Sequence, residues 1–160
     1  VGSAPPASPA TARAERDGAV LTLTVERSRY QAGEQVLADV RIENTSAQPI
    51  GWLGGGCEVP AVVLARSGDD VGYFIERMLW ERSGGQPVAC TANIAERTLG
   101  AGEHYALRFV WDATFRSSTI RAAGGRLEVR ATFPMGDFRS SDPLDATTEI
   151  EIVAVGANSR

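Results

Sequence analysis

The residues of this chain that could do chemistry are few and stand far apart in the sequence. Its one histidine, His104, follows a Gly-Glu pair and opens an alternating segment. A serine–histidine–aspartate hydrolase would have to use this imidazole, yet the chain has no G-x-S-x-G elbow to present a nucleophile. We therefore expect a surface histidine at the end of a strand, no catalytic residue, and a protein that is not an enzyme.

Carboxylates gather in the loop GDFRSSDPLD, which carries Asp137, Asp142 and Asp145. Carboxylate oxygens are the ligands that Ca²⁺ prefers, but the spacing of these three matches no EF-hand loop. A further pair, Asp69-Asp70, follows Ser-Gly and is typical of a solvated turn. We therefore expect no metal site and no cofactor.

The two cysteines, Cys57 and Cys90, have 32 residues between them. They form no C-x-x-C motif, and with a single histidine they cannot complete a standard zinc site of four nitrogen or sulfur ligands. We predict a disulfide that links the loop after Leu53 to a short strand around Ala89. The alternative is two unpaired buried thiols in a cytosolic protein. A disulfide indicates an oxidising compartment.

Composition is that of an ordinary globular domain and excludes one class of partner. The chain has 160 residues, of which 43% are hydrophobic and 22% charged. Its net charge is −4, and its 16 basic residues are all arginine and scattered, so we expect no nucleic-acid binding. No segment reaches the ~20 apolar residues that a transmembrane helix needs.

Residues 1–18 are predicted to form a flexible tether. Their first part, VGSAPPASPATARA, is dominated by Ala, Pro and Ser, a composition that cannot bury much apolar surface. Such a segment commonly follows a removed signal peptide or a lipidated cysteine. We therefore expect an exported protein, periplasmic or extracellular, with a lipid anchor upstream of Val1 as one form. The alternative is a plain disordered tail.

The segment 30–46, YQAGEQVLADVRIENTS, predicts a turn followed by a strand with one buried face. Apolar residues alternate with polar ones along it, which is the pattern of a strand half in a core and half in water. The residues expected to face the core are Val36, Ala38, Val40 and Ile42. Similar short segments, separated by Gly, Pro and Asp turns, recur at 20–27, 61–66, 104–111, 126–133 and 147–155. This spacing favours an all-β, antiparallel Greek-key sandwich of seven to nine strands.

The segment 71–80, VGYFIERMLW, fits a strand and a short helix equally, and the sequence leaves the structure of Val71–Arg97 open. If its large side chains are exposed, they make a candidate partner-binding patch. The residues of this predicted patch are Tyr73, Phe74, Met78 and Trp80. The alternative is that they cap one end of the core. Trp52, Tyr105, Trp111 and Phe133 are assigned to the core itself.

Three stretches together resemble a known family. They are YQAGEQVLADVRIENTS, LGAGEHYALRFVWD and GGRLEVRATF. They are similar to the pattern of bacterial immunoglobulin-like domains related to the intracellular proteinase inhibitor family. In that pattern one Gly-Glu turn precedes a strand ending in Asn-x-Ser/Thr, and another precedes a strand ending in Trp. The resemblance covers about 21–133 and implies an immunoglobulin-like sandwich. The family's name implies proteinase inhibition, without designating inhibitory residues.

We therefore expect an immunoglobulin-like domain over 19–156, monomeric, that binds a protein or an envelope component through its loops as an exported or lipid-tethered accessory module. The alternative function is a proteinase inhibitor that presents a loop to a protease cleft. The loops 54–60 and 134–143 are the candidates for that role.

Overall fold

The computed structural model describes residues 8–55, 57, 59–85, 90, 93–113 and 125–153. These residues form twelve strands and one helix, arranged in two five-stranded sheets and a two-stranded ribbon. The first sheet has the order β1 (Ala10–Arg16), β2 (Ala19–Val25), β4 (Val36–Asn44), β10 (His104–Trp111) and β8 (Ile75–Glu76). The second has the order β3 (Arg29–Gln31), β12 (Leu144–Val153), β11 (Gly125–Phe133), β6 (Val62–Ser67) and β7 (Asp70–Tyr73). The ribbon pairs β5 (Ile50–Gly54) with β9 (Ala95–Leu99), and α1 spans Arg77–Ser83.

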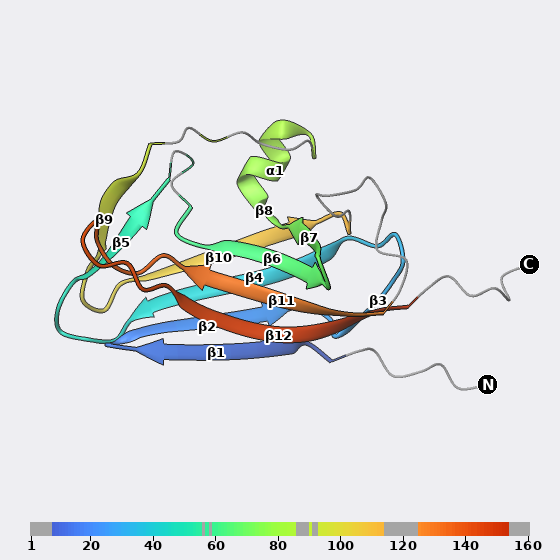
Figure 1. Ribbon diagram of the computed structural model, residues 1–160, viewed down its shortest axis with the longest axis horizontal. Helices are drawn as coiled ribbons and strands as arrows, with labels where there is room; N and C mark the ends of the chain where they lie inside the picture. The colour runs from blue at the N-terminus through green and yellow to red at the C-terminus, as the bar shows by residue number, and fades with distance from the viewer. Residues whose placement is uncertain are drawn as a thin grey trace, which may run out of the picture.

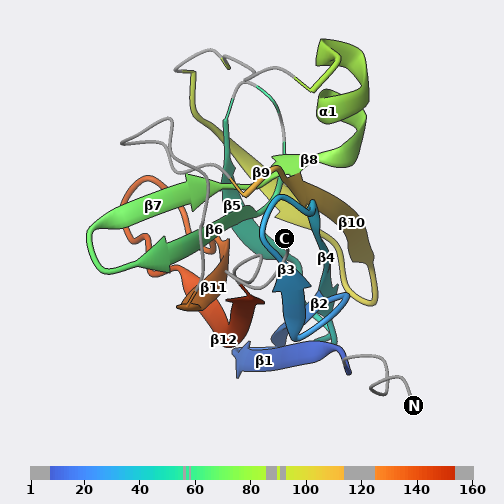
Figure 2. The same cartoon turned by 90° about the vertical axis from the view of Figure 1, so that its right-hand side faces the viewer.

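The two sheets pack face to face and enclose one core (Figures 1 and 2). Along β4 the four residues predicted to face inward are 0 to 1% exposed, and alternate residues of β11 from the opposite sheet are 0 to 2% exposed. The all-β prediction is confirmed. The described residues form twelve strands, more than the seven to nine predicted, because several short edge strands have too few residues to show an alternating pattern. The immunoglobulin-like Greek-key order stays a prediction.

One pair of neighbouring strands departs from the antiparallel prediction. β3 runs parallel to β12, with Tyr30 opposite Ile152. The other strand pairs among the described residues are antiparallel. β3 is only three residues long and follows β2 after a short turn, so it joins the second sheet at its edge while the chain crosses from one sheet to the other.

The predicted tether is wrong for residues 10–16, which form β1 and pair with β2 along their whole length. The reason is a two-residue hairpin turn at Asp17-Gly18, where both residues have positive φ (51° and 85°). Asp-Gly favours this turn, and its twist matches that of paired strands. The alanines of β1 then face the core, and Ala10 is 7% exposed. Residues 1–7 lie outside the described part of the chain.

Two turns of the same sequence, Ala-Gly-Glu, are closed in the same way. In the first, the backbone N–H of Glu34 donates to the carbonyl of Gln31, while the Glu34 carboxylate accepts the N–H of Gln31 at 2.7 Å. In the second, Glu103 and Gly100 make the same reciprocal pair. The glutamate therefore fixes each turn through its side chain, which explains why a Gly-Glu pair precedes both β4 and β10.

The segment 71–80, for which the sequence fits a strand and a short helix equally, contains both kinds of structure. The chain leaves the second sheet at β7, enters the first at β8 and continues into α1. The Glu76 carboxylate caps the helix by accepting the N–H groups of Met78 and Leu79. Gly84, in the left-handed conformation, ends it. Within the described residues, α1 is too short to cross a bilayer, and no other helix is a candidate.

Candidate functional site

The structure divides the predicted patch of four residues. Phe74 is 6% exposed and its ring lies 5.7 Å from that of Trp111, so the prediction that it is available to a partner is wrong. The reason is the alternation at the end of β7, which directs Tyr73 outward (41% exposed) and Phe74 into the core. Met78 on α1 is 61% exposed, and Trp80 is half-buried. What remains exposed comes from two different elements.

The predicted disulfide is confirmed: Cys57 and Cys90 are bonded, with their Cα atoms 5.3 Å apart. It ties the loop before β6 to the segment that follows α1. Cys90 itself does not lie in a strand, and residues 88, 89, 91 and 92 of the predicted strand are outside the described residues. A disulfide is compatible with an exported protein.

The carboxylates of the acidic loop serve separate structural roles. One oxygen of Asp137 accepts the backbone N–H groups of Arg139 and Ser140, both at 2.8 Å. Asp142 pairs with Arg16 at 3.5 Å, and Asp145 accepts the hydroxyl of Thr132 at 2.6 Å. Among the described residues, no three His, Cys, Asp or Glu side chains gather closely enough to hold a metal ion.

His104 opens β10 as predicted, opposite Glu43 of β4, and its side chain is exposed. Among the described residues, no serine hydroxyl or cysteine thiol forms a hydrogen bond with the His104 imidazole.

Residues 136–141 form a tight turn that exposes an aromatic side chain at its tip. The N–H of Asp137 donates to the carbonyl of Ser140 at 3.0 Å, and Gly136 and Ser141 form an isolated bridge. Gly136 has φ of 125°, and a Cβ there would collide with the Ser140 carbonyl, so glycine is required. Phe138 is 63% exposed, and its N–H is held at 3.0 Å by the carboxylate of Glu96 in β9.

The same turn is attached to the ribbon. The N–H of Leu53 donates to the carbonyl of Pro134, and the N–H of Gly136 donates to the carbonyl of Gly51, each at 2.9 Å. We call the surface made by β5, β9 and residues 134–143 the loop end; it lies at the left of Figure 1. Ile94, just before β9, is 60% exposed there. The sequence predicts 134–143 as a loop but does not point to Phe138, because this residue stands alone among polar neighbours.

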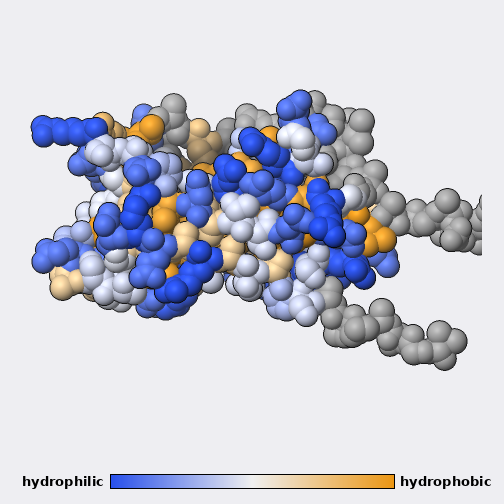
Figure 3. All heavy atoms as spheres, turned by 60° about the horizontal axis from the view of Figure 1, so that its bottom comes forward, coloured by the Kyte–Doolittle hydropathy of each residue, from blue (hydrophilic) through white to orange (hydrophobic). Residues whose placement is uncertain are grey.

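The structure also shows how the face beside the loop end is covered. Figure 3 shows the face that carries β1 and β12, on which hydrophilic residues are interleaved with small apolar areas. Charged side chains near β12 form ion pairs with one another. Examples are Arg29 with Glu151 at 3.1 Å and Arg126 with Glu149 at 3.0 Å. Since these charges satisfy one another, the outer faces of the sheets are weaker candidates for binding than the loop end.

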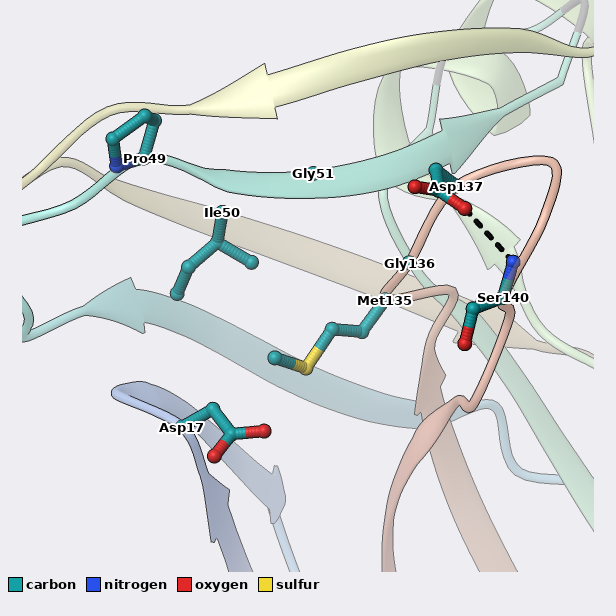
Figure 4. Close-up of a pocket in the computed structure, with 8 residues that line it drawn as sticks. All are labelled: Asp17, Pro49, Ile50, Gly51, Met135, Gly136, Asp137 and Ser140. Carbon is teal, nitrogen blue, oxygen red and sulfur yellow. Dashed lines mark hydrogen bonds between the residues drawn. The ribbon is translucent and has the colours of Figure 1, made fainter.

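The loop end holds an open cleft of about 300 Å³ (Figure 4). Three segments far apart in sequence line it: the β1–β2 turn, the start of β5, and the turn after β11. The lining residues are Asp17, Pro49, Ile50, Gly51, Met135, Gly136, Asp137 and Ser140.

No family model matches the chain, and no curated protein matches it. Among solved structures, it is similar to a β-glucosidase from Listeria innocua in complex with glucose, with a TM-score of 0.42 and 13% identity over 87% of this chain. A mutant form of that enzyme in complex with laminaribiose gives a TM-score of 0.44, 12% identity and 88% coverage of this chain. The chain covers 16% of the length of either enzyme, and these similarities carry no information on its activity.

Proposed function

We propose that this chain is a non-enzymatic, monomeric binding domain of an exported bacterial protein, and that it takes a protein or a cell-envelope component at the loop end. One observation carries the proposal: Phe138 is 63% exposed at the tip of a turn whose backbone is held by hydrogen bonds. A membrane-tethered form of the same protein is compatible with this role.

Exposed aromatic side chains contribute strongly to binding when they enter a pocket of a partner. Ordering a loop on binding normally costs free energy, and a side chain on a turn that is already fixed avoids most of that cost. Asp137 and Glu96 hold the backbone on both sides of Phe138. The turn therefore presents the Phe138 side chain from a backbone that is already fixed before any partner arrives.

The test compares three forms of the chain in pelleting assays with envelope fractions of the source bacterium and with purified peptidoglycan. Replacing Phe138 with alanine should weaken binding about tenfold or more, the loss expected of an aromatic anchor. Val62→Ala is the matched control, because Val62 is also exposed (48%) but lies on β6, outside the loop end. Equal binding by Phe138→Ala and the unchanged chain would refute the proposal.

A second candidate function is proteinase inhibition through the loop 54–60. The observation that favours it is the disulfide at Cys57, which restrains this loop from within. The other candidate loop, 134–143, is less suited, because entering a protease cleft in extended form would break the hydrogen bonds of the turn at Asp137. Inhibition of a panel of serine, cysteine and metallo-proteases, lost when the disulfide is reduced, would favour this function over the first.

A further inference from the structure

We infer that the cleft at the loop end binds the side chain of a lysine or arginine of a partner protein. The inference rests on the proposed function, because it names the chemistry of the partner at the same surface. It follows from three features of the cleft: its apolar floor, its two carboxylates, and the hydrogen bonds already made by the guanidinium of Arg16.

The floor is formed by Ile50 and Met135, whose side chains lie in the middle of the cleft in Figure 4. Pro49 adds to its apolar surface. Lysine and arginine carry aliphatic stems that bury along apolar surface while the charged group stays near water. A short and open cleft of about 300 Å³ fits one such stem better than a compact buried ligand.

The carboxylates of Asp17 and Asp137 lie on opposite sides of this floor (Figure 4). Asp17 is exposed and makes no hydrogen bond or ion pair with the other described residues. Only one oxygen of Asp137 is used by the backbone of the turn. A cationic group at either end of the floor would therefore gain a charged acceptor without displacing a protein partner.

The guanidinium of Arg16, which contacts the cleft floor, does not neutralise the cleft. It lies beside the floor, 3.6 Å from the sulfur of Met135, but it is already engaged. Its partners are the carbonyl oxygens of Asp142 and Pro143 and the carboxylate of Asp142 at 3.5 Å. Since Asp142 balances the charge of Arg16, the carboxylates of Asp17 and Asp137 remain at the cleft, so the local charge favours a basic ligand and disfavours an acidic one.

The experiment is an NMR titration of the full chain with Nα-acetyl-lysine methylamide, followed through the backbone amides of Gly51, Gly136 and Ser140. The uncharged isostere Nα-acetyl-norleucine methylamide is the matched ligand control. We expect shifts of these three amides with the lysine probe, shifts that weaken as salt is added, and much smaller shifts with norleucine.

Two charge-removing variants keep the local structure. Asp17→Asn suits the positive φ of 51°, because asparagine tolerates the left-handed region. Asp137→Asn keeps the side-chain oxygen that accepts the N–H groups of Arg139 and Ser140. Each should weaken lysine binding about threefold to fivefold, the effect of one exposed ion pair. Asp69→Asn, on the exposed β6–β7 turn, should change nothing.

Three results would overturn the inference: no shift of the cleft amides up to the solubility of the probe, equal shifts with norleucine, or unchanged binding when both aspartates are replaced. Binding of cadaverine without binding of the lysine amide would overturn the assignment to a protein side chain. Failure here is distinguishable from failure of the proposed function, because the effect of Phe138→Ala on envelope binding is measured independently.

Discussion

Replacing Asn44 with alanine is expected to lower the free energy of unfolding more than most single substitutions. Asn44 is the last residue of β4 and is 0% exposed. Among the described residues, it is the one polar residue in the buried class. Its Nδ2 donates to the carbonyls of Gln48 at 2.7 Å and Leu99 at 3.0 Å. Its Oδ1 accepts the N–H of Ser46 at 3.0 Å and the Ser46 hydroxyl at 2.7 Å. One side chain thus joins the ends of β4 and β9 with the β4–β5 loop.

The magnitude follows from what the truncation leaves behind. Leu99 is 2% exposed, and its hydrogen bond from Asn44 is buried, so the loss of this donor costs about 1–3 kcal/mol. The groups of Gln48 and Ser46 lie nearer to solvent and regain part of their hydrogen bonding from water. We expect a total loss of about 2–4 kcal/mol. For a chain of this size, this corresponds to a fall in Tm of roughly 5–15 °C.

Urea unfolding followed by tryptophan fluorescence measures the effect. Asn93→Ala is the matched control, because Asn93 is exposed and the same truncation there should cost less than about 0.5 kcal/mol. Asn44→Asp adds a test of mechanism: at neutral pH it places an anion against two carbonyl oxygens, and at low pH the protonated carboxyl can donate. Its stability relative to Asn44→Ala should therefore rise as pH falls. A loss below about 1 kcal/mol for Asn44→Ala would refute the reasoning.

Three further predictions concern other parts of the fold. Reducing the disulfide, which bridges a sequence separation of 33, should lower the free energy of unfolding by about 3–4 kcal/mol; equal urea midpoints with and without reductant would contradict this. A hydrogen bond from the Arg27 guanidinium holds the pKa of Glu34 below the ordinary 4.5. The stabilising effect of the Glu34 carboxylate is therefore present above about pH 4.5 and is lost as pH falls through the lower folded value. Stability curves of the unchanged chain and Glu34→Gln should accordingly converge on acidification, and a constant gap down to acid pH would count against the linkage. Gly72→Ala should cost about 1–3 kcal/mol in the same urea assay, because its Cβ would lie 2.5 to 2.6 Å from the buried indole of Trp111. Gly55→Ala, with open space around the new Cβ, should be near neutral.

Much of the fold could be predicted from local patterns. Alternation over 36–43 and 126–133 identified the inward residues of β4 and β11, because a strand that is half in a core must repeat with a period of two. The disulfide was predictable because a chain with two cysteines allows a single pairing. The turns before β4 and β10 shared a sequence, and they share a structure, because the glutamate that closes each turn acts within four residues.

Other features depended on contacts between distant segments. β1 forms a local hairpin with β2, but its alanines are too small to stand out from a disordered composition, and only the core packed against them shows that they are partly buried. Alternation places Tyr73 and Phe74 on opposite faces, but only the position of β7 at the edge of the second sheet shows that Phe74 is the one that faces the core.

The candidate site belongs to this second class. Phe138 became a candidate only when the turn around it proved to be fixed by a carboxylate from β9. The cleft brings together residues 17, 50 and 135, which are far apart in the sequence and carry no shared motif. Sequence determines which face of each strand is apolar, since that is a property of neighbouring residues. Only the tertiary structure decides which turns meet at one end of the sandwich, since that depends on the order and register of every strand between them.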